Sequence, residues 1–318
     1  MIIDLHPEFG LELALGITYA YWLHKRGELE GVHTVEGMKP FYYFCDSVEE
    51  KYDHRTIDNE IGGLNSLPNN WIHHNAIAIT GKDYSELTLE EQNKVNGVLD
   101  YSKWEVPPYK DYYKDTEFKF DKPMVVVSNR YNLDHGEPPL AYLDVEILYK
   151  IFNYLTENGY GVIYKRPDNT EFPLDQNEIN GIRMGYKDII ANVDGVGEIT
   201  DYQLTEYYDD VFLLNDLIKA KDSTEYNTKQ LQIFSLAKGF ITMGGGGSLL
   251  CSMFGVPNIS LINSSTECNR KGYYEGPDNY YRKMSDHDFY PILDSVDNIK
   301  NRGYRDYTKL IKKIKEVF

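Results

Sequence analysis

Four consecutive glycines, Gly244, Gly245, Gly246 and Gly247, constrain the fold of this chain more than any other feature of its sequence. The apolar residues 240–243 precede them and are typical of a buried strand. Residues 248–254 predict a short helix, and residues 258–262 predict the next strand. A strand that passes through a tight turn directly into a helix is the connection of parallel α/β sheets. The segment therefore predicts an α/β fold.

The glycines also predict a ligand site. Glycine lets the backbone approach a ligand closely and adopt positive φ. The first turn of the following helix offers N–H groups without helical partners and a partial positive charge, which together suit a diphosphate. The hydroxyl of Ser248 could cap this helix or bind the phosphate. The competing interpretation is a turn that needs small residues and binds nothing.

The alternation of strands and helices extends over most of the chain. Residues 1–5 predict a strand and residues 11–24 a helix, with further strands at residues 41–44 and 76–80. A second series starts at residue 124. Its strands are predicted at residues 124–127, 162–164, 211–214, 240–243 and 258–262, and its helices at residues 140–155, 226–237 and 304–318.

With 318 residues, the chain has the length of two ordinary domains. Residues 98–122 are polar and rich in tyrosine, which favours a connection between domains; an elaborated surface loop of one domain is the alternative. We therefore expect an N-terminal domain at 1–115, a second domain at 116–300, and a terminal helix at 301–318 that could cross back to the first domain.

Composition excludes several classes of protein. The net charge of −17 argues against binding to nucleic acid or to an anionic membrane surface. The sequence contains no apolar run of about 20 residues that could span a bilayer. Three widely spaced cysteines give neither a metal-binding spacing nor a disulfide framework, and no signal peptide is recognisable at the start. We expect a cytoplasmic protein without a bound metal.

Cationic side chains follow two strands of the second series. Arg130 comes just after residues 124–127, and Lys165 and Arg166 come after residues 162–164. Ligands of parallel α/β sheets bind at the carboxyl ends of the strands, so these cations are expected near the glycines. There they would stabilise the charge of a leaving diphosphate. Each could instead be an ordinary surface cation.

Strand, glycine turn, helix and the Phe254-Gly255-Val256-Pro257 step before the next strand resemble the nucleotide-binding half of GT-B glycosyltransferases. The resemblance is detailed over residues 234–262 and elsewhere concerns only the order of elements. Residues 248–257 contain no acidic residue, whereas retaining GT-B enzymes carry a Glu-x7-Glu pattern across this helix. The chain is therefore most similar to the inverting branch, including heptosyl-, fucosyl- and N-acetylglucosaminyl-transferases and sugar transferases of large algal viruses.

The resemblance implies two Rossmann-like, doubly wound parallel-sheet domains that face a cleft. It implies a UDP- or GDP-linked sugar as donor substrate, no permanently bound cofactor, and a carbohydrate or other hydroxyl acceptor. The strand end at Leu214 and Asn215 would lie beside the nucleobase. An inverting transfer also needs a general base from the first domain.

His6 and Glu8 follow the first predicted strand and are the candidate bases, and Asp4 could orient His6. A histidine at such a position is more often a structural hydrogen-bonding group. Two other functions remain open: a nucleotide-sugar epimerase of the same architecture, and a non-catalytic nucleotide- or glycan-binding protein. The glycine spacing fits neither the dinucleotide-binding fingerprint nor a Walker A loop.

Overall fold

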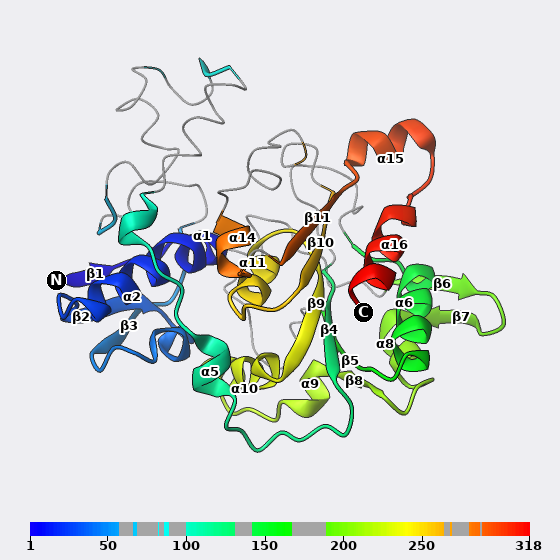
Figure 1. Ribbon diagram of the computed structural model, residues 1–318, viewed down its shortest axis with the longest axis horizontal. Helices are drawn as coiled ribbons and strands as arrows, with labels where there is room; N and C mark the ends of the chain where they lie inside the picture. The colour runs from blue at the N-terminus through cyan, green and yellow to red at the C-terminus, as the bar shows by residue number, and fades with distance from the viewer. Residues whose placement is uncertain are drawn as a thin grey trace.

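The computed structural model describes most of the chain as an α/β protein with two parallel sheets and one antiparallel hairpin (Figure 1). The smaller sheet lies near the N-terminus, and the larger sheet occupies the centre of the molecule. The hairpin joins β6 (Ile190–Val193) to β7 (Gly197–Thr200). The described residues are 1–56, 66–68, 82, 86–88, 100–130, 142–166, 189–263, 268, 280–286 and 288–318.

The smaller sheet contains β1 (Ile2–Asp4), β2 (Gly31–Val35) and β3 (Val48–Tyr52), all parallel and in that order. The crossover from β1 to β2 is one continuous helical stretch. It consists of α1 (Phe9–Leu11), the π-helix η1 (Glu12–Ile17) and α2 (Thr18–Lys25), and its apolar side chains belong to the same buried cluster as Ile3 and Leu5. The predicted first strand and first helix are confirmed.

The predicted strand at residues 41–44 is wrong. These residues lie in and after the 3-10 helix η2 (Lys39–Tyr42), where Pro40 occupies the first turn and Phe41 is completely buried. Proline has no N–H for a strand ladder and its φ is fixed, which suits the start of a helix. The strand predicted at residues 76–80 lies outside the described residues.

The tyrosine-rich connection is firmly attached to the smaller sheet and its helices. It carries η6 (Tyr101–Lys103) and α5 (Tyr109–Tyr113). The indole Nε1 of Trp104 donates to the carbonyl of Ala14 at 2.7 Å, and the Tyr109 hydroxyl donates to the carbonyl of Phe41 at 2.7 Å. The aromatic residues that made this stretch look atypical therefore anchor it to the elements beside β1.

The larger sheet has the strand order β11-β10-β9-β4-β5-β8, and every neighbouring pair is parallel. The chain starts in the middle at β4, moves outward to β8, then crosses to β9 and moves outward on the other side. This order is that of a doubly wound nucleotide-binding sheet, whose topological switch point lies between the two central strands, here β4 and β9. The strands are β4 (Met124–Ser128), β5 (Gly161–Lys165), β8 (Val211–Leu213), β9 (Ala237–Met243), β10 (Asn258–Ile262) and β11 (Phe289–Leu293).

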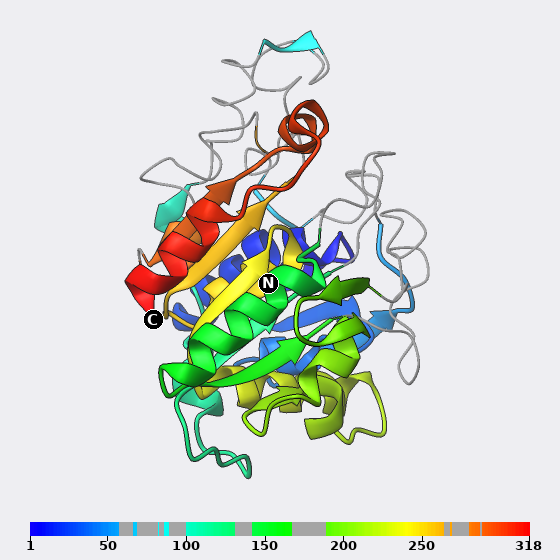
Figure 2. The same ribbon diagram turned by 90° about the vertical axis from the view of Figure 1, so that its right-hand side faces the viewer.

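Helices cover both faces of the larger sheet, as Figure 2 shows for the face with α6 and α16. The alternation Val125, Val126, Val127 sends successive side chains into the two separate buried clusters, one on each face. The cluster with Val126 continues into the smaller sheet. One face carries α6 (Val145–Glu157), α8 (Asp201–Thr205) and α16 (Thr308–Val317); the other carries α9 (Leu214–Leu217), α10 (Ser223–Ser235), α11 (Gly246–Ser252) and α14 (Tyr280–Met284).

The elements predicted for the second series are confirmed with shifted ends, and some elements were not predicted. Helix α6 begins after Asp144, whose carboxylate accepts the Ile147 N–H at 3.0 Å, and α11 begins two residues earlier than expected. Strand β11, the β6–β7 hairpin and α15 (Val296–Arg302) were not predicted. On the smaller sheet, the helices of the β1–β2 crossover cover one face. A doubly wound domain has helices on both faces of its sheet, so the described residues do not complete a second domain of this kind.

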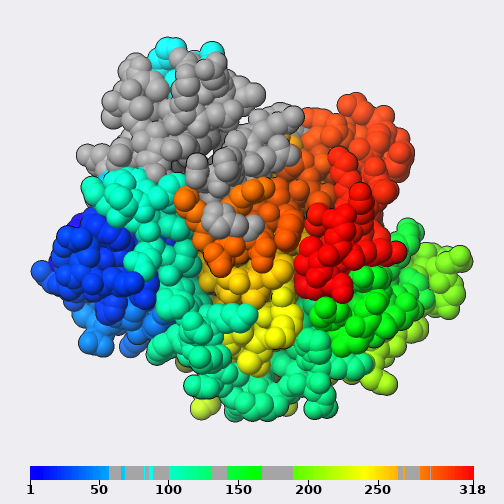
Figure 3. All heavy atoms as spheres, in the orientation of Figure 1, coloured from blue at the N-terminus to red at the C-terminus, as the bar shows by residue number. Residues whose placement is uncertain are grey.

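The last helix was expected to return to the first domain, and the structure places it elsewhere. Leu310 and Ile314 of α16 are buried in the cluster that includes Ile259 and Ile292 of the larger sheet. A Cβ added at Gly239 of β9 would lie 2.5 Å from the ring of Phe318, so the glycine makes room for this ring. In Figure 3, α16 forms the red surface on the side away from the blue N-terminal strands.

A buried polar network fixes α11 on the larger sheet. The Asn258 side-chain amide donates to the Ser248 carbonyl at 3.0 Å and to the Ser252 hydroxyl at 2.8 Å, and its oxygen accepts from Thr242 at 2.9 Å. The Ser248 hydroxyl donates to Ser260 at 2.9 Å. All five side chains are completely buried. Small residues here let the helix lie close to the strands and satisfy each other's hydrogen bonds.

We expect Asn258→Ala to lower the free energy of unfolding by about 2–3 kcal/mol, because it leaves several buried groups without hydrogen-bond partners. Denaturant titration measures the change. Asn192→Ala, at an exposed position of β6, is the matched control and should change it by less than about 0.5 kcal/mol. Equal effects in both variants would show that the network does not stabilise α11.

Candidate functional site

The glycine loop, residues 244–247, connects β9 to α11 at the switch point. The Gly244 N–H still belongs to the sheet and donates to the Leu261 carbonyl at 2.9 Å. Gly245 is the N-cap of α11, with φ of 112° and ψ of −165°. Side-chain-bearing residues rarely adopt this conformation, so the turn requires glycine at this position. Gly246 and Gly247 form the first turn of the helix, where N–H groups have no helical acceptor.

Arg130 lies against this loop from the end of β4. A Cβ added at Gly245 would be 2.5 Å from Arg130 Nη1 and 3.2 Å from its Cζ. The missing side chain at Gly245 therefore makes the space for the guanidinium. A cation and a helix N-terminus thus lie side by side at the carboxyl ends of β4 and β9.

A buried hydrogen-bond network holds the backbone of Arg130. Asn129 accepts the N–H of Arg130 at 2.9 Å and that of Leu143 at 2.8 Å, and its amide donates to the Tyr164 hydroxyl at 3.0 Å. Tyr164 in turn donates to Asp201 at 2.6 Å. Burial raises the pKa of Asp201, and the nearby guanidinium of Arg166 opposes that shift.

Arg166 and Lys165, the other two cations predicted from the sequence, point away from the glycine loop. Arg166 is completely buried, with its Nε 2.6 Å from Asp201 Oδ2, so it supports the network behind Arg130 and does not face solvent. Lys165 donates from Nζ to Gln230 Oε1 at 2.5 Å and lies over the ring of Phe234. Burial lowers the pKa of this lysine. The structure places Lys165 beneath α10, and no described contact joins it to the glycine loop.

Ser248 has neither of the roles expected for it. It neither caps α11 nor reaches the loop surface, because its hydroxyl is used in the buried network and Gly245 is the cap. Leu214 is a core residue at the start of α9, and its carbonyl accepts the Ile218 N–H at 3.0 Å. Asn215 accepts the Tyr226 hydroxyl at 3.1 Å.

The turn after β1, residues 6–10, packs directly on the glycine loop. A Cβ at Gly10 would lie 3.4 Å from Gly246 Cα and 3.2 Å from the side chain of Leu249. In the reverse direction, a Cβ at Gly246 would lie 3.0 Å from the ring of Phe9 and 3.3 Å from the Gly10 nitrogen. The two backbones approach this closely because both positions are glycine. The 6–10 turn and Arg130 therefore contact neighbouring glycines of the same loop.

His6 stacks on Tyr52, with ring centroids 4.2 Å apart. Its Nδ1 is buried and has no hydrogen-bond partner among the described residues. Burial lowers the pKa of His6, and the charge of Asp4 partly offsets this. The imidazole is therefore neutral at neutral pH, which is the form that can accept a proton.

Asp4 does not orient His6 by a hydrogen bond, contrary to the sequence prediction. Burial alone would raise its pKa, but hydrogen bonds from Tyr52, His33 and Lys51 outweigh burial and lower the pKa to about 2. His33 Nδ1 lies 3.1 Å from Asp4 Oδ2, and Lys51 Nζ lies 3.2 Å from the same oxygen. Asp4 therefore acts on His6 through its charge and through Tyr52, which donates to Asp4 and stacks on the His6 ring.

Glu8 precedes α1 as its N-cap residue, and its carbonyl accepts the Glu12 N–H at 3.0 Å. Its side chain makes no capping hydrogen bond to the helix. Glu8 thus lies in the same turn as His6, so the structure leaves both as candidates for the base.

Sequence reasoning missed two buried charged residues behind the 6–10 turn. Glu12 is completely buried in η1, and Arg55 is nearly so after β3. Arg55 Nη1 lies 2.5 Å from Glu12 Oε2 and 2.9 Å from the Pro7 carbonyl. The acidic residue in an apolar helical run was the available signal for Glu12. Arg55 gave no signal, since it is one cation in a charged stretch.

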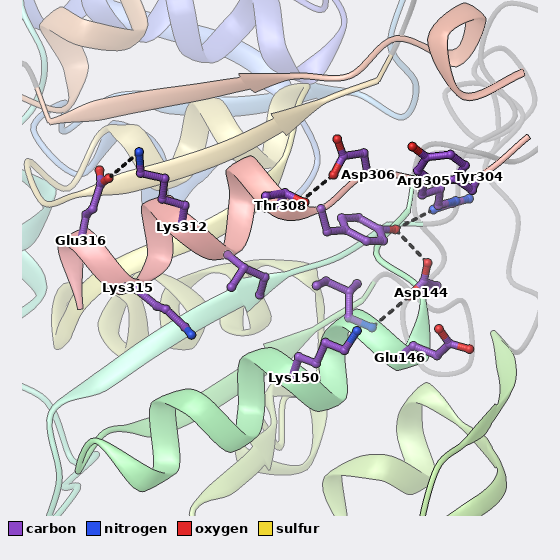
Figure 4. A pocket seen from close by; sticks show the side chains of 13 residues that line it. Asp144, Glu146, Lys150, Tyr304, Arg305, Asp306, Thr308, Lys312, Lys315 and Glu316 are labelled. Atoms are coloured by element: carbon purple, nitrogen blue, oxygen red, sulfur yellow. Dashed lines mark hydrogen bonds and ion pairs between the residues drawn. The ribbon is translucent and has the colours of Figure 1, made fainter. Parts of the chain in front are cut away.

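A groove of about 1020 Å³ lies between α6 and α16, away from these residues (Figure 4). Lysines and acidic residues line it together, and Asp144 accepts the Tyr307 hydroxyl at 2.9 Å within it. None of the sequence-predicted site residues lines this groove.

In the described parts of the chain, no three His, Cys, Asp or Glu side chains are grouped so that they could hold a metal ion. None of the three cysteines, Cys45, Cys251 and Cys268, forms a disulfide bond. Across the same parts, every helix is too short or too polar to cross a bilayer.

The comparisons with known proteins find similarity only in the course of the backbone, in solved structures. No protein-family model matches the sequence, and no curated protein matches it. The ADP-heptose LPS heptosyltransferase II of E. coli is similar over 92% of this chain and 89% of that chain, with 12% identity and a TM-score of 0.47. A family 9 glycosyl transferase from Veillonella parvula DSM 2008 is similar over 98% and 88%, with 11% identity and a TM-score of 0.41. A UDP-N-acetylglucosamine 2-epimerase follows over 90% and 89%, with 11% identity and a TM-score of 0.35.

We expect Gly245→Ala to lower the affinity for a nucleoside diphosphate at least about tenfold, because the new methyl group displaces Arg130 and strains the turn. Gly247→Ala is the matched control: its methyl group meets only Ser128 Oγ, at an ordinary 3.7 Å. Titration calorimetry measures both affinities, and thermal melting confirms that both variants fold. Equal affinity in the two variants would remove the glycine loop from the binding site.

Proposed function

We propose that this protein is a glycosyltransferase that takes a sugar from a nucleotide diphosphate donor and transfers it with inversion. The observation that carries the proposal is the contact between Arg130 and Gly245 at the switch point of a doubly wound sheet. Ligands of such sheets bind at this crevice, beyond the carboxyl ends of the strands. A guanidinium beside a helix N-terminus is a suitable environment for a diphosphate.

The proposed reaction is a single displacement. The acceptor hydroxyl attacks the anomeric carbon while the bond from that carbon to the diphosphate oxygen breaks. The negative charge that develops on the leaving diphosphate is stabilised by Arg130 and the N–H groups at the start of α11. The proton of the acceptor hydroxyl passes to the base, for which His6 is the first candidate and Glu8 the second.

The 6–10 turn supports the choice of His6. Its contact with the glycine loop brings the first predicted strand end to the proposed leaving group. The neutral imidazole can take up a proton, whereas Asp4, with a pKa of about 2, is too weak a base for this step.

We further propose the remaining sequence expectations for this enzyme. They are a first domain at 1–115, a donor-binding domain at 116–300, a UDP- or GDP-linked donor, a carbohydrate acceptor, metal-independent transfer and a cytoplasmic location. The likeness to sugar transferases of large algal viruses belongs to the same group of sequence-based proposals.

We expect Arg130→Ala to weaken binding of the nucleoside diphosphate about 10- to 100-fold, the typical contribution of hydrogen bonds to a charged group. Thermal-shift screening with UDP, GDP, dTDP and CMP selects the ligand, and calorimetry gives the affinities. Arg302→Ala, which removes a cation of α15, is the control and should bind like the natural protein. Absence of binding by any of these nucleotides would contradict the proposal.

We expect His6→Ala to lower kcat by about 10²–10⁴-fold with little change in donor affinity, as removal of a general base does. Because the pKa of His6 is lowered from 6.5, the activity of the natural enzyme should fall to half only at a pH below 6.5. The acidic limb of the pH–rate profile should therefore lie below pH 6.5 and disappear in His6→Ala. Unchanged kcat in His6→Ala together with a loss in Glu8→Ala would assign the base to Glu8.

The anomeric configuration of the product separates the possible reactions. A single displacement gives inversion, so a product that retains the donor configuration would contradict the proposed mechanism. Turnover of the nucleotide sugar to its epimer without any acceptor would instead identify an epimerase. Nucleotide binding without turnover would identify a binding protein.

A further inference from the structure

A carboxylate buried behind the 6–10 turn has no role in the reaction described above. Glu12 begins the π-helix η1, one turn after Glu8, and its side chain is completely inaccessible to solvent. Its Oε1 accepts hydrogen bonds from Thr34 and, at 2.9 Å, from Tyr42, and its Oε2 lies 2.5 Å from Arg55 Nη1. Insertion of an extra residue into a helical turn is frequent at functional sites.

Arg55 connects this carboxylate to the turn. The same nitrogen that pairs with Glu12 also donates to the Pro7 carbonyl at 2.9 Å. Its guanidinium carbon lies 5.4 Å from the centre of the Phe9 ring. The adjacent Thr56 N–H donates to the His6 carbonyl at 2.7 Å. Residues 55 and 56 therefore hold the two successive carbonyl groups of His6 and Pro7.

We propose that Glu12 and Arg55 are positioning residues that set the orientation of the 6–10 turn against the glycine loop. The proposal rests on the proposed transferase function, because the group that the pair positions is the candidate base His6. Neither residue touches a substrate. Arg55 acts on the turn through the Pro7 carbonyl, and Glu12 fixes the guanidinium that does so.

The burial of the pair favours this interpretation over a stabilising role. Transfer of two charges out of water costs about as much as their attraction returns, so a buried ion pair gives little net stability. Replacement of a buried ion pair by apolar side chains of similar volume is often neutral for stability. What they could not supply is the directed hydrogen bond to the Pro7 carbonyl, which fixes one conformation of a turn that contains Gly10.

The electrostatic environment of His6 gives a measurement of whether the pair lies beside the turn in solution. The charge of Glu12 raises the pKa of His6 and that of Arg55 lowers it, while Asp4 raises it and His54 lowers it. The Tyr52 ring covers one face of the imidazole. If the pair keeps its place beside the turn, removal of the Glu12 charge must lower the pKa of His6, because the charge of Arg55 remains.

The experiment compares Glu12→Gln, Arg55→Met and Arg55→Lys with the natural protein. The control is Arg302→Lys, the same substitution in the partly buried pair of Arg302 with Asp294, whose atoms are 2.8 Å apart. Carbon-13 labelling of histidine Cε1 gives the pKa of each ring by NMR, and His6→Gln assigns the His6 signal. We expect the pKa of His6 to fall in Glu12→Gln.

Kinetics completes the test. Lysine keeps the charge but cannot contact Glu12 and the Pro7 carbonyl with the same planar geometry, so Arg55→Lys should lower kcat about 10- to 100-fold at unchanged nucleotide affinity. Arg302→Lys should leave kcat unchanged. Equal loss of kcat in Arg55→Lys and Arg302→Lys, or parallel loss of nucleotide affinity in Arg55→Lys, would overturn the proposal.

The two proposals fail in different ways. If the natural protein transfers no sugar, the transferase function fails, and the His6 titrations alone decide whether the pair acts on the turn. An unchanged or raised His6 pKa in Glu12→Gln overturns the positioning role. Full kcat in all three variants would also overturn it, while the transferase function would stand.

Discussion

The contact between the 6–10 turn and the start of α11 depends on two positions without a side chain. At Gly10 and Gly246 the backbones of two distant segments lie so close that a methyl group on either would press on the other. The proposed pairing of a base with the leaving group follows from this contact, because it brings the end of β1 to the end of β9. Gly245, one residue earlier, makes the corresponding space for Arg130. Gly10 and Gly246 thus face each other, whereas Gly245 faces Arg130, and the proposed diphosphate site needs only the space around Gly245.

The parts of the fold that the sequence predicted are those where the local pattern and the tertiary environment agree. Residues 124–127 are apolar throughout and are buried on both faces in the centre of the sheet. The apolar run at 240–243, before the glycines, predicts its strand equally clearly. By contrast, β3 contains two glutamates and a lysine and is half-exposed, so its alternation does not resemble that of a core strand. The aromatic segment at 41–44 was misread because burial of Phe41 and Tyr42 in a 3-10 helix produces the same apolar signal as a strand.

The sequence predicted where the backbone of the site lies, but it did not predict the directions in which the side chains point. Parallel topology alone placed Arg130 and the glycine loop together. It could not show that Ser248 turns inward to Ser260, or that Lys165 lies beneath α10, because these directions depend on hydrogen-bond partners on other elements. The same limit applies to Glu12 and Arg55. Their importance lies in contacts between residues more than forty positions apart, which no local pattern contains.

The strand order also has a consequence for how the protein reaches its native state. Helix α6 lies between β4 and β5 in the chain, whereas Val126 of β4 meets Phe240 of β9 only after more than a hundred intervening residues have been placed. The entropy of closing so long a loop delays such pairing, so we infer that β4–α6–β5 forms early and the β4–β9 seam forms late. Arg130 and Gly245 lie on opposite sides of that seam. The chain therefore acquires its proposed anion-binding surface only when its central seam closes, and a nucleotide can recognise only those molecules that have completed folding.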